Sequence, residues 1–171
     1  MTGLEFSRVL LAGFVAAGMA ACQAQPAQPQ ANAGTAAAQG DAVARHPVSG
    51  LEVVPLTVTS DGRQHRFRVE VARTDAQQQR GLMERRTLGP DEGMIFPYNP
   101  PRMQSFWMKN TPLPLDIIFI GPDGRIINIA ANTRPMSEEQ YLSDAPASLV
   151  LELRGGRAGE LGIGPGDLVE W

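Results

Sequence analysis

Apolar and polar residues alternate along several short stretches of the chain, and glycine, proline and aspartate separate these stretches. Val53–Thr59 is predicted to be a strand, and Ser60-Asp61-Gly62-Arg63 carries the Asp-Gly signal of a hairpin turn. The returning segment His65–Ala72 places Phe67, Val69 and Val71 on one face and Arg66, Arg68 and Glu70 on the other. This pattern is typical of an antiparallel strand with one face exposed.

The rest of this region continues the pattern of short strands. Thr74-Asp75-Ala76-Gln77 fits a capping box and Gly81 fits a helix stop, so a helix of about two turns is expected between them. Gly155–Gly162 is expected to be a turn that leads to a second short helix. Further strands are predicted at Gly93–Tyr98, Met103–Met108, Leu115–Ile120, Arg125–Ala131, Ser148–Arg154 and Leu168–Trp171. Such spacing predicts a mainly β fold, a compact antiparallel or mixed β-barrel-like domain with one or two short helices.

The amino terminus has a different character. A basic residue and the apolar run 9–21 precede Cys22, so residues 1–21 are interpreted as a signal peptide. Met19-Ala20-Ala21-Cys22 resembles a bacterial lipobox, although an ordinary secretory cut is the alternative. Residues 22–48 would then be the lipidated Cys22 and a flexible Ala/Gln/Pro linker, and residues 49–171 a single β-rich domain.

Cys22 is the only cysteine, so the folded part contains no disulfide bond within the chain. The lipobox resemblance implies an exported protein that is anchored to the cell envelope through a lipid on Cys22. Gln23 stands where an inner-membrane retention signal usually has Asp, which favours the outer membrane, facing the periplasm.

Charge and motif content exclude several kinds of function. The chain has 15 Lys and Arg against 18 Asp and Glu without a basic block, so no nucleic-acid partner is expected. No metal is predicted, since spaced Cys and His ligands are missing and the methionines do not cluster as Cu(I) ligands do. No cofactor motif and no serine or cysteine nucleophile motif appears. A monomer is favoured.

The segment Phe106–Ile120 carries the most chemistry, because polar side chains interrupt an otherwise apolar strand. Trp107 is expected either to stack on a flat or sugar-like ligand or to fill the end of the barrel. Asp116 and Glu152 each fall on a partly apolar strand face. They are expected to be held by a cation or by loop amides, or alternatively to form an acid/base pair.

These residues lead to a site hypothesis and three functional alternatives. The first is a binding or accessory module for a small molecule or glycan; the second is a small envelope hydrolase using Asp116 and Glu152; the third is a purely structural envelope protein. Whether the chain is an enzyme is left open, with a non-enzymatic role preferred. The proposed binding residues are Met83, Arg85, Trp107, Lys109, Asn110, Asp116 and Glu152.

Several segments resemble one family in the same order. They are Arg80-Gly81-Leu82-Met83, Glu92-Gly93-Met94-Ile95-Phe96, Phe106-Trp107-Met108-Lys109-Asn110-Thr111, Pro114-Leu115-Asp116-Ile117-Ile118-Phe119 and Leu151-Glu152-Leu153. The chain is similar, over about residues 56–170, to the bacterial and archaeal family called domain of unknown function 192. The resemblance implies a compact, β-rich, barrel-like domain that is often exported, and it implies no activity.

Overall fold

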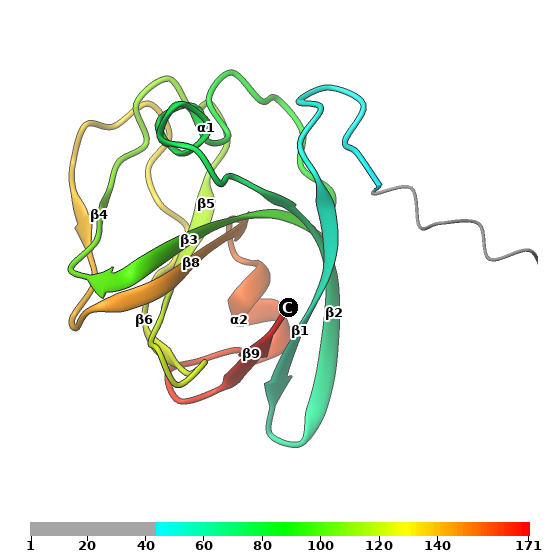
Figure 1. Cartoon of the computed structure of the whole chain (residues 1–171), viewed down its shortest axis with the longest axis vertical. Helices are drawn as coiled ribbons and strands as arrows, with labels where there is room; N and C mark the ends of the chain where they lie inside the picture. Colours follow the sequence, from blue (N-terminus) through cyan, green and yellow to red (C-terminus); the bar gives the residue numbers. More distant parts are fainter. Residues whose placement is uncertain (1–43) are drawn as a thin grey trace, which may run out of the picture. The chain divides into compact units, whose positions relative to one another are not determined.

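The computed structural model describes residues 44–171, and two short helices and nine strands lie within that range (Figure 1). The strands are β1 (Val53–Ser60), β2 (Arg63–Val71), β3 (Glu92–Arg102), β4 (Ser105–Phe106), β5 (Leu115–Ile120), β6 (Ile126–Ala130), β7 (Tyr141–Leu142), β8 (Ala147–Arg154) and β9 (Leu168–Glu170). The helices are α1 (Asp75–Arg80) and α2 (Arg157–Leu161). The predicted signal peptide, Cys22 and most of the predicted linker lie outside the described residues.

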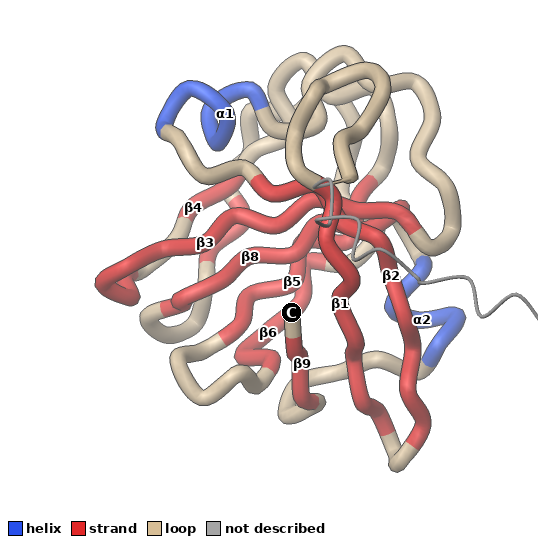
Figure 2. Tube along the Cα trace, turned by 45° about the vertical axis from the view of Figure 1, so that its right-hand side comes forward, coloured by secondary structure: helices blue, strands red, loops and turns tan. Residues whose placement is uncertain are grey.

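Seven strands form one mixed sheet in the order β6-β5-β8-β3-β2-β1-β9. The pairing is antiparallel except between β2 and β3, which run parallel with α1 in the connection between them. Figure 2 shows how the strands curve around one another. At one end the edges meet: Ile126 N–H donates to Asp167 C=O at 2.9 Å, and Val169 N–H donates to Gly124 C=O at 2.8 Å. The predicted mainly β, barrel-like class with two short helices is therefore confirmed.

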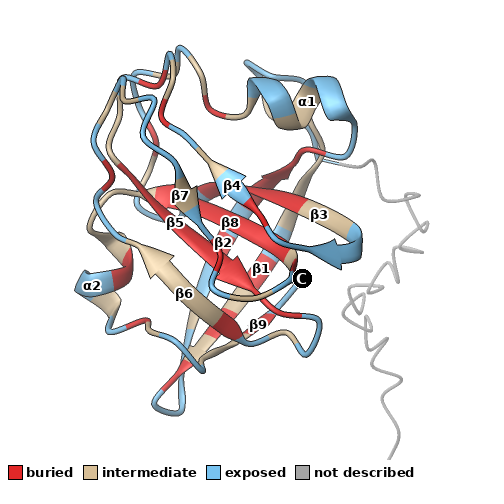
Figure 3. Ribbon diagram, turned by 90° about the vertical axis from the view of Figure 1, so that its left-hand side faces the viewer, coloured by how far each residue is buried: buried red, intermediate tan, exposed pale blue. Residues whose placement is uncertain are grey.

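Each face of the sheet carries its own apolar cluster. The inner face of the curved sheet packs side chains from β1, β2, β5, β8 and β9 together with Ala158 and Ile163, in and after α2. The outer face carries Met94, Phe96, Ile117 and Val150 and is covered by the loops around α1, β4 and β7. Figure 3 shows buried residues along β5, β8 and β3, and mostly exposed residues on α1.

Local sequence signals explain where elements begin and end. Thr74 Oγ1 accepts the Gln77 N–H, and the Gln77 side chain accepts the Thr74 N–H, so the predicted capping box forms and α1 stops at Gly81. β3 pairs with β8 as far as Pro97 and again at Arg102, with an irregular stretch between. Pro97, Pro100 and Pro101 lack the N–H that a continuous ladder needs, which accounts for the interruption.

Two strand predictions need correction. The strand expected over Met103–Met108 is only the two residues of β4, which pair with β7, an element that the sequence did not reveal. Glu70, expected on the exposed face of β2, is buried with 3% of its surface exposed. The loop after α1 covers this part of β2, because Arg85 reaches the Glu70 carboxylate.

Residues 44–52 fold onto the domain. His46 N–H donates to Leu51 C=O at 2.9 Å, and Ser49 Oγ donates to the Glu70 carboxylate. His46, in the segment that the sequence assigns to the linker, also contacts β2, because its Nε2 lies 3.7 Å from a Glu70 oxygen.

Candidate functional site

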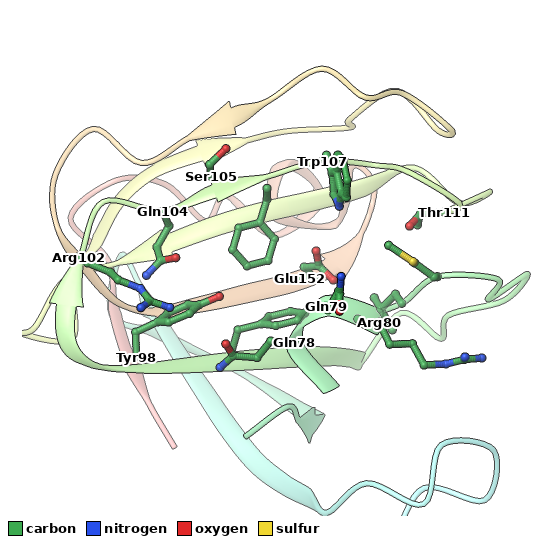
Figure 4. A pocket seen from close by; sticks show the side chains of 15 residues that line it. Gln78, Gln79, Arg80, Tyr98, Arg102, Gln104, Ser105, Trp107, Thr111 and Glu152 are labelled. Atoms are coloured by element: carbon green, nitrogen blue, oxygen red, sulfur yellow. The ribbon is translucent and has the colours of Figure 1, made fainter. Parts of the chain in front are cut away.

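A pocket of about 300 Å³ opens on the outer face of the sheet, between α1 and the β4 region. Glu152, near the end of β8, lies in it among Tyr98, Gln104 and Trp107 (Figure 4). The register of β8 explains this position. Glu152 pairs with Met94 on one side and Ile117 on the other, so its side chain shares the face of two buried apolar residues.

The interrupted part of β3 supplies one wall. Phe96 and Tyr98 alternate with Pro97 and so project to the same side of the strand as Met94. Beyond the irregular stretch, the Arg102 guanidinium lies 5.0 Å from the centre of the Tyr98 ring. Arg102 is therefore held at the mouth of the pocket by a cation–π contact.

The segment around β4 forms the opposite wall. The Gln104 backbone exchanges two hydrogen bonds with Ser143, one to Ser143 Oγ at 2.9 Å and one from Ser143 N–H at 3.0 Å. Phe106 packs edge-on against Phe96 with ring centres 5.1 Å apart. Trp107 follows at the rim with 40% of its surface exposed, and Lys109 Nζ lies over its ring, 5.0 Å from the ring centre.

Helix α1 closes the third side. Gln78 Nε2 donates to Ala72 C=O at 3.2 Å and to Pro97 C=O at 3.0 Å, which joins the helix to the end of β2 and to β3. Met83 lines the pocket from the loop after the helix. The pocket thus draws its walls from segments far apart in the chain.

Electrostatics single out Glu152. Only 4% of its surface is exposed, and burial raises the pKa of its carboxyl to about 8, so the group is mostly neutral at pH 7. Burial also raises the pKa of Tyr98 to about 12; Arg102 opposes this rise and Glu152 adds to it.

The pocket contains polar atoms that lack partners. Within residues 44–171, the buried side-chain atoms without a hydrogen-bond partner are His65 Nε2, Gln104 Nε2 and Glu152 Oε2. The last two belong to residues that line this one pocket. An unsatisfied buried polar group costs about 1–3 kcal/mol, so a ligand that pairs with both would recover stabilisation that the free protein lacks.

The structure brings three of the residues proposed from sequence together: Met83, Trp107 and Glu152 line the pocket. Asp116 does not join them. It pairs in register with Leu153, so it projects to the inner face of the sheet and is fully buried there. Its carboxylate accepts three backbone N–H groups, those of Asn132 at 2.7 Å, Gly156 at 2.8 Å and Ala158 at 2.8 Å.

The remaining proposed residues have structural partners. Arg85 donates to both Glu70 oxygens, at 2.7 and 2.8 Å, and lines a neighbouring depression. Lys109 Nζ lies 3.2 Å from a Glu138 oxygen and 5.0 Å from the Trp107 ring centre. Asn110 lies in a turn and has a positive φ of 56°. Its backbone carbonyl accepts the Glu84 N–H at 2.8 Å.

This geometry removes the basis for pairing Asp116 with Glu152 as two catalytic carboxylates. The two side chains lie on opposite faces of the sheet, and an acid/base pair must flank one scissile bond in one cleft. Instead, backbone N–H groups of the surrounding loops and the start of α2 hold the Asp116 carboxylate, which is one of the arrangements that the sequence analysis expects.

Several pocket residues were not proposed from sequence, namely Gln78, Phe96, Tyr98, Arg102, Gln104 and Phe106. Strand alternation starting from Met94 predicts that Phe96 and Tyr98 lie on the same strand face. This is the one sequence signal that could have identified them as pocket residues. Their approach to Glu152 depends on the register between β3 and β8, which no local pattern in the sequence specifies.

Two further findings concern the described part of the chain. Across residues 44–171, no three His, Cys, Asp or Glu side chains gather as ligands for a metal ion. No helix in this range is long and apolar enough to cross a membrane.

Comparison with known proteins gives the family. The model of DUF192, described as "Uncharacterized ACR", matches residues 56–171. No curated protein matches the chain significantly. A crystal structure of a protein of unknown function from Novosphingobium aromaticivorans is 57% identical, with a TM-score of 0.74, covering 75% of this chain and 91% of that one. A second crystal structure, of a protein from Sinorhizobium meliloti described as a "putative transcription regulator", is 42% identical, with a TM-score of 0.68, covering 70% of this chain and 94% of that one. The chain therefore belongs to the DUF192 family of proteins of unknown function.

Proposed function

We propose that the domain is a binding module that holds a small molecule, or one sugar unit of a glycan, in the Glu152 pocket. The observation that carries this proposal is the pair of unpartnered buried atoms, Gln104 Nε2 and Glu152 Oε2, in residues that line one cavity. Ligand pockets combine a mostly apolar or aromatic lining with a few polar groups that fix orientation. Here the aromatic part of that lining consists of Phe96, Tyr98, Phe106 and Trp107.

The partial exposure of Trp107 supports a glycan in particular. Lys109 lies near the indole and leaves 40% of the Trp107 surface accessible. Aromatic rings with one exposed face can stack on flat or sugar-like molecules, while neighbouring amides and carboxyls bind hydroxyl groups. A pocket of about 300 Å³ lies at the lower end of the usual range for small-molecule sites and fits about one sugar ring.

The test compares two tryptophans. We expect the full-length chain to bind members of an array of bacterial envelope glycans and Trp107→Ala to lose at least about tenfold in affinity, in line with the loss of a stacked aromatic contact. Trp171→Ala is the matched control, because Trp171 is similarly exposed at 49% but does not line the pocket. Equal binding by wild type and Trp107→Ala would contradict the proposal. So would a wild type that binds no glycan and whose melting temperature does not rise with any small molecule of a metabolite library.

We further propose that the module is exported and held at the cell envelope, facing the periplasm, by a lipid on Cys22. The support is the sequence around Met19-Ala20-Ala21-Cys22 and the Ala/Gln/Pro composition of residues 23–43. Mass spectrometry of the protein from membrane fractions should find a diacylglyceryl modification on Cys22. Cys22→Ser should lack the modification and leave the membrane fraction. An unmodified Cys22 in a protein cut elsewhere would favour the ordinary secretory alternative.

A further inference from the structure

Two buried glutamates lie on the same row of the sheet, and their surroundings differ. Glu70 on β2 pairs in register with Met94 on β3, and Met94 pairs with Glu152 on β8. All three side chains therefore belong to the outer face. Glu70 is 3% exposed and receives two hydrogen bonds from Arg85, whereas Glu152 is 4% exposed and forms no ion pair within residues 44–171. The fold thus supplies a cation to one carboxyl group and not to the other.

Ionisable groups face Glu152 from β3 and α1, and its neighbour on β5 is apolar. From β3, Tyr98 and Arg102 face the pocket, and Arg102 is engaged with the Tyr98 ring. From the end of α1, Arg80 lines the pocket and is paired with Glu84 at 3.0 Å. From β5, the neighbour in register is the apolar Ile117.

Glu152 is consequently a hydrogen-bond donor at neutral pH. Without a cation partner, its buried carboxyl keeps its proton, as the rise of its pKa to about 8 indicates. A protonated carboxyl group offers an O–H, and Gln104 Nε2 offers N–H groups that have no partner in the described residues. Both unsatisfied groups therefore suit acceptor oxygens on a ligand.

The mouth of the pocket adds positive charge. Arg102 is exposed and forms no ion pair within the described part of the chain. A guanidinium group matches the geometry of a carboxylate with two parallel hydrogen bonds. With Glu152 neutral, the ionisable lining residues present two guanidinium groups and no anion. A cationic ligand would be repelled at this mouth, and an acidic one attracted.

We propose that the occupant of this pocket is an acidic sugar, a ring with several hydroxyl oxygens and one carboxylate. This inference rests on the proposed binding function and names the ligand class for the same site. The sugar ring packs against the exposed part of the Trp107 indole, its hydroxyl oxygens accept hydrogen bonds from Glu152 and Gln104, and its carboxylate pairs with Arg102.

The experiment uses three small probes: D-glucuronate, its uncharged parent D-glucose, and choline as a cation. Binding to the full-length chain is followed by NMR through the indole N–H signals. The chain has two tryptophans, so Trp107 reports on the pocket and Trp171 is the internal control. We expect the Trp107 signal to move with D-glucuronate at roughly tenfold lower concentration than with D-glucose, as one ion pair implies. Choline should move neither signal.

Two variants test the assigned roles. Arg102→Ala should bind D-glucuronate and D-glucose about equally, because only the carboxylate contact is removed. Glu152→Gln keeps a neutral donor of the same shape, so it should bind D-glucuronate as the wild type does near pH 6. Above about pH 8, the wild type should lose affinity as Glu152 ionises, by up to about tenfold per pH unit, and Glu152→Gln should not.

The outcomes separate this inference from the proposed function. Two results would overturn the acidic-sugar inference and still leave a binding pocket in place. One is that the wild type binds choline in preference to D-glucuronate; the other is that its affinity for D-glucuronate increases as the pH rises. Loss of D-glucuronate binding in Glu152→Gln near pH 6 would show that Glu152 binds as a carboxylate, which also overturns it. If no probe moves the Trp107 signal, the inference fails, and the glycan array with the Trp107→Ala comparison decides the proposed function separately.

Discussion

At the scale of single residues, the fold treats its buried carboxyl groups in different ways. Asp116 is satisfied by three backbone N–H groups, Glu70 by a guanidinium group, and Glu152 by neither. Burial alone therefore does not identify a functional carboxyl group. The absence of a partner within the described residues, together with a pocket, distinguishes Glu152.

Asp116 is expected to be important for stability. Asp116→Ala leaves three backbone N–H groups without their acceptor in a fully buried position, which should lower the free energy of unfolding by about 2–4 kcal/mol. Urea denaturation measures the change. Asp123→Ala serves as the control, because Asp123 is exposed and accepts one N–H, that of Arg125. An unchanged urea midpoint for Asp116→Ala would contradict this assignment.

Glu152 is expected to make stability depend on pH. Its pKa is about 8 in the folded protein against an ordinary value of 4.5, so between these values the folded state binds more protons than the unfolded state. Stability should therefore fall as the pH rises from about 5 to about 8, with a contribution of at most about 1.4 kcal/mol per pH unit, and level off above.

Glu152→Gln removes this titration and provides the comparison. The variant should be close to the wild type in stability near pH 5 and increasingly more stable than it as the pH approaches 8. Thermal unfolding followed by circular dichroism at several pH values measures the difference. A constant difference between the two proteins across this range would mean that Glu152 titrates normally.

At the scale of elements, close contacts between strands set strict requirements. A Cβ on Gly93 of β3 would lie 2.5 Å from the Glu152 carbonyl oxygen and 2.9 Å from a Leu153 methyl carbon. The β8 backbone cannot move away without disturbing its hydrogen bonds to the neighbouring strands, which position Glu152. Gly93→Ala is therefore expected to destabilise the domain by about 3 kcal/mol, the upper end of the usual range for an overpacked core.

Gly159 in α2 is the matched control. No heavy atom lies within 4 Å of the Cβ it would gain, so Gly159→Ala should be neutral or stabilise by up to about 1 kcal/mol through helix propensity. Differential scanning calorimetry of both variants makes the comparison. If both behave alike, the close approach of β3 to β8 is not as described.

A buried ion pair joins the loop after α1 to β2. Arg85→Leu would leave the Glu70 carboxylate buried without its guanidinium partner, at a cost of about 3–5 kcal/mol. Arg86→Leu is the control, since Arg86 is exposed and has no ion pair within residues 44–171. Chemical denaturation of both variants should show a large loss only for Arg85→Leu. Equal midpoints would mean that the pair contributes little.

At the scale of the whole molecule, the sequence predicts most elements and fewer of their contacts. Leu115–Ile120 coincides with β5, and the faces of β5 and β8 follow from alternation because both strands are regular. Alternation does not reveal the two-residue β4 and β7, which are too short to show a period. It also misplaces Glu70, because a covering loop overrides the pattern of the strand.

The candidate site was predictable only in part, for the same reason. Trp107 and Glu152 stand out in sequence because a large aromatic residue and a lone carboxylate interrupt apolar runs. Gln104 and Arg102 do not, since ordinary polar residues occur throughout loops. Their position depends on the hydrogen bonds to Ser143 and on the contact with Tyr98, which form only in the folded chain.

The central claim is that a neutral, unpartnered Glu152 faces the pocket. Carbon-13 NMR of the glutamate side-chain carboxyl groups against pH tests it most directly. One carboxyl signal should titrate near pH 8 in the wild type and be missing from Glu152→Gln. If every glutamate carboxyl titrates below about pH 5, Glu152 is charged in the folded protein and both the donor role and the acidic-sugar site are wrong.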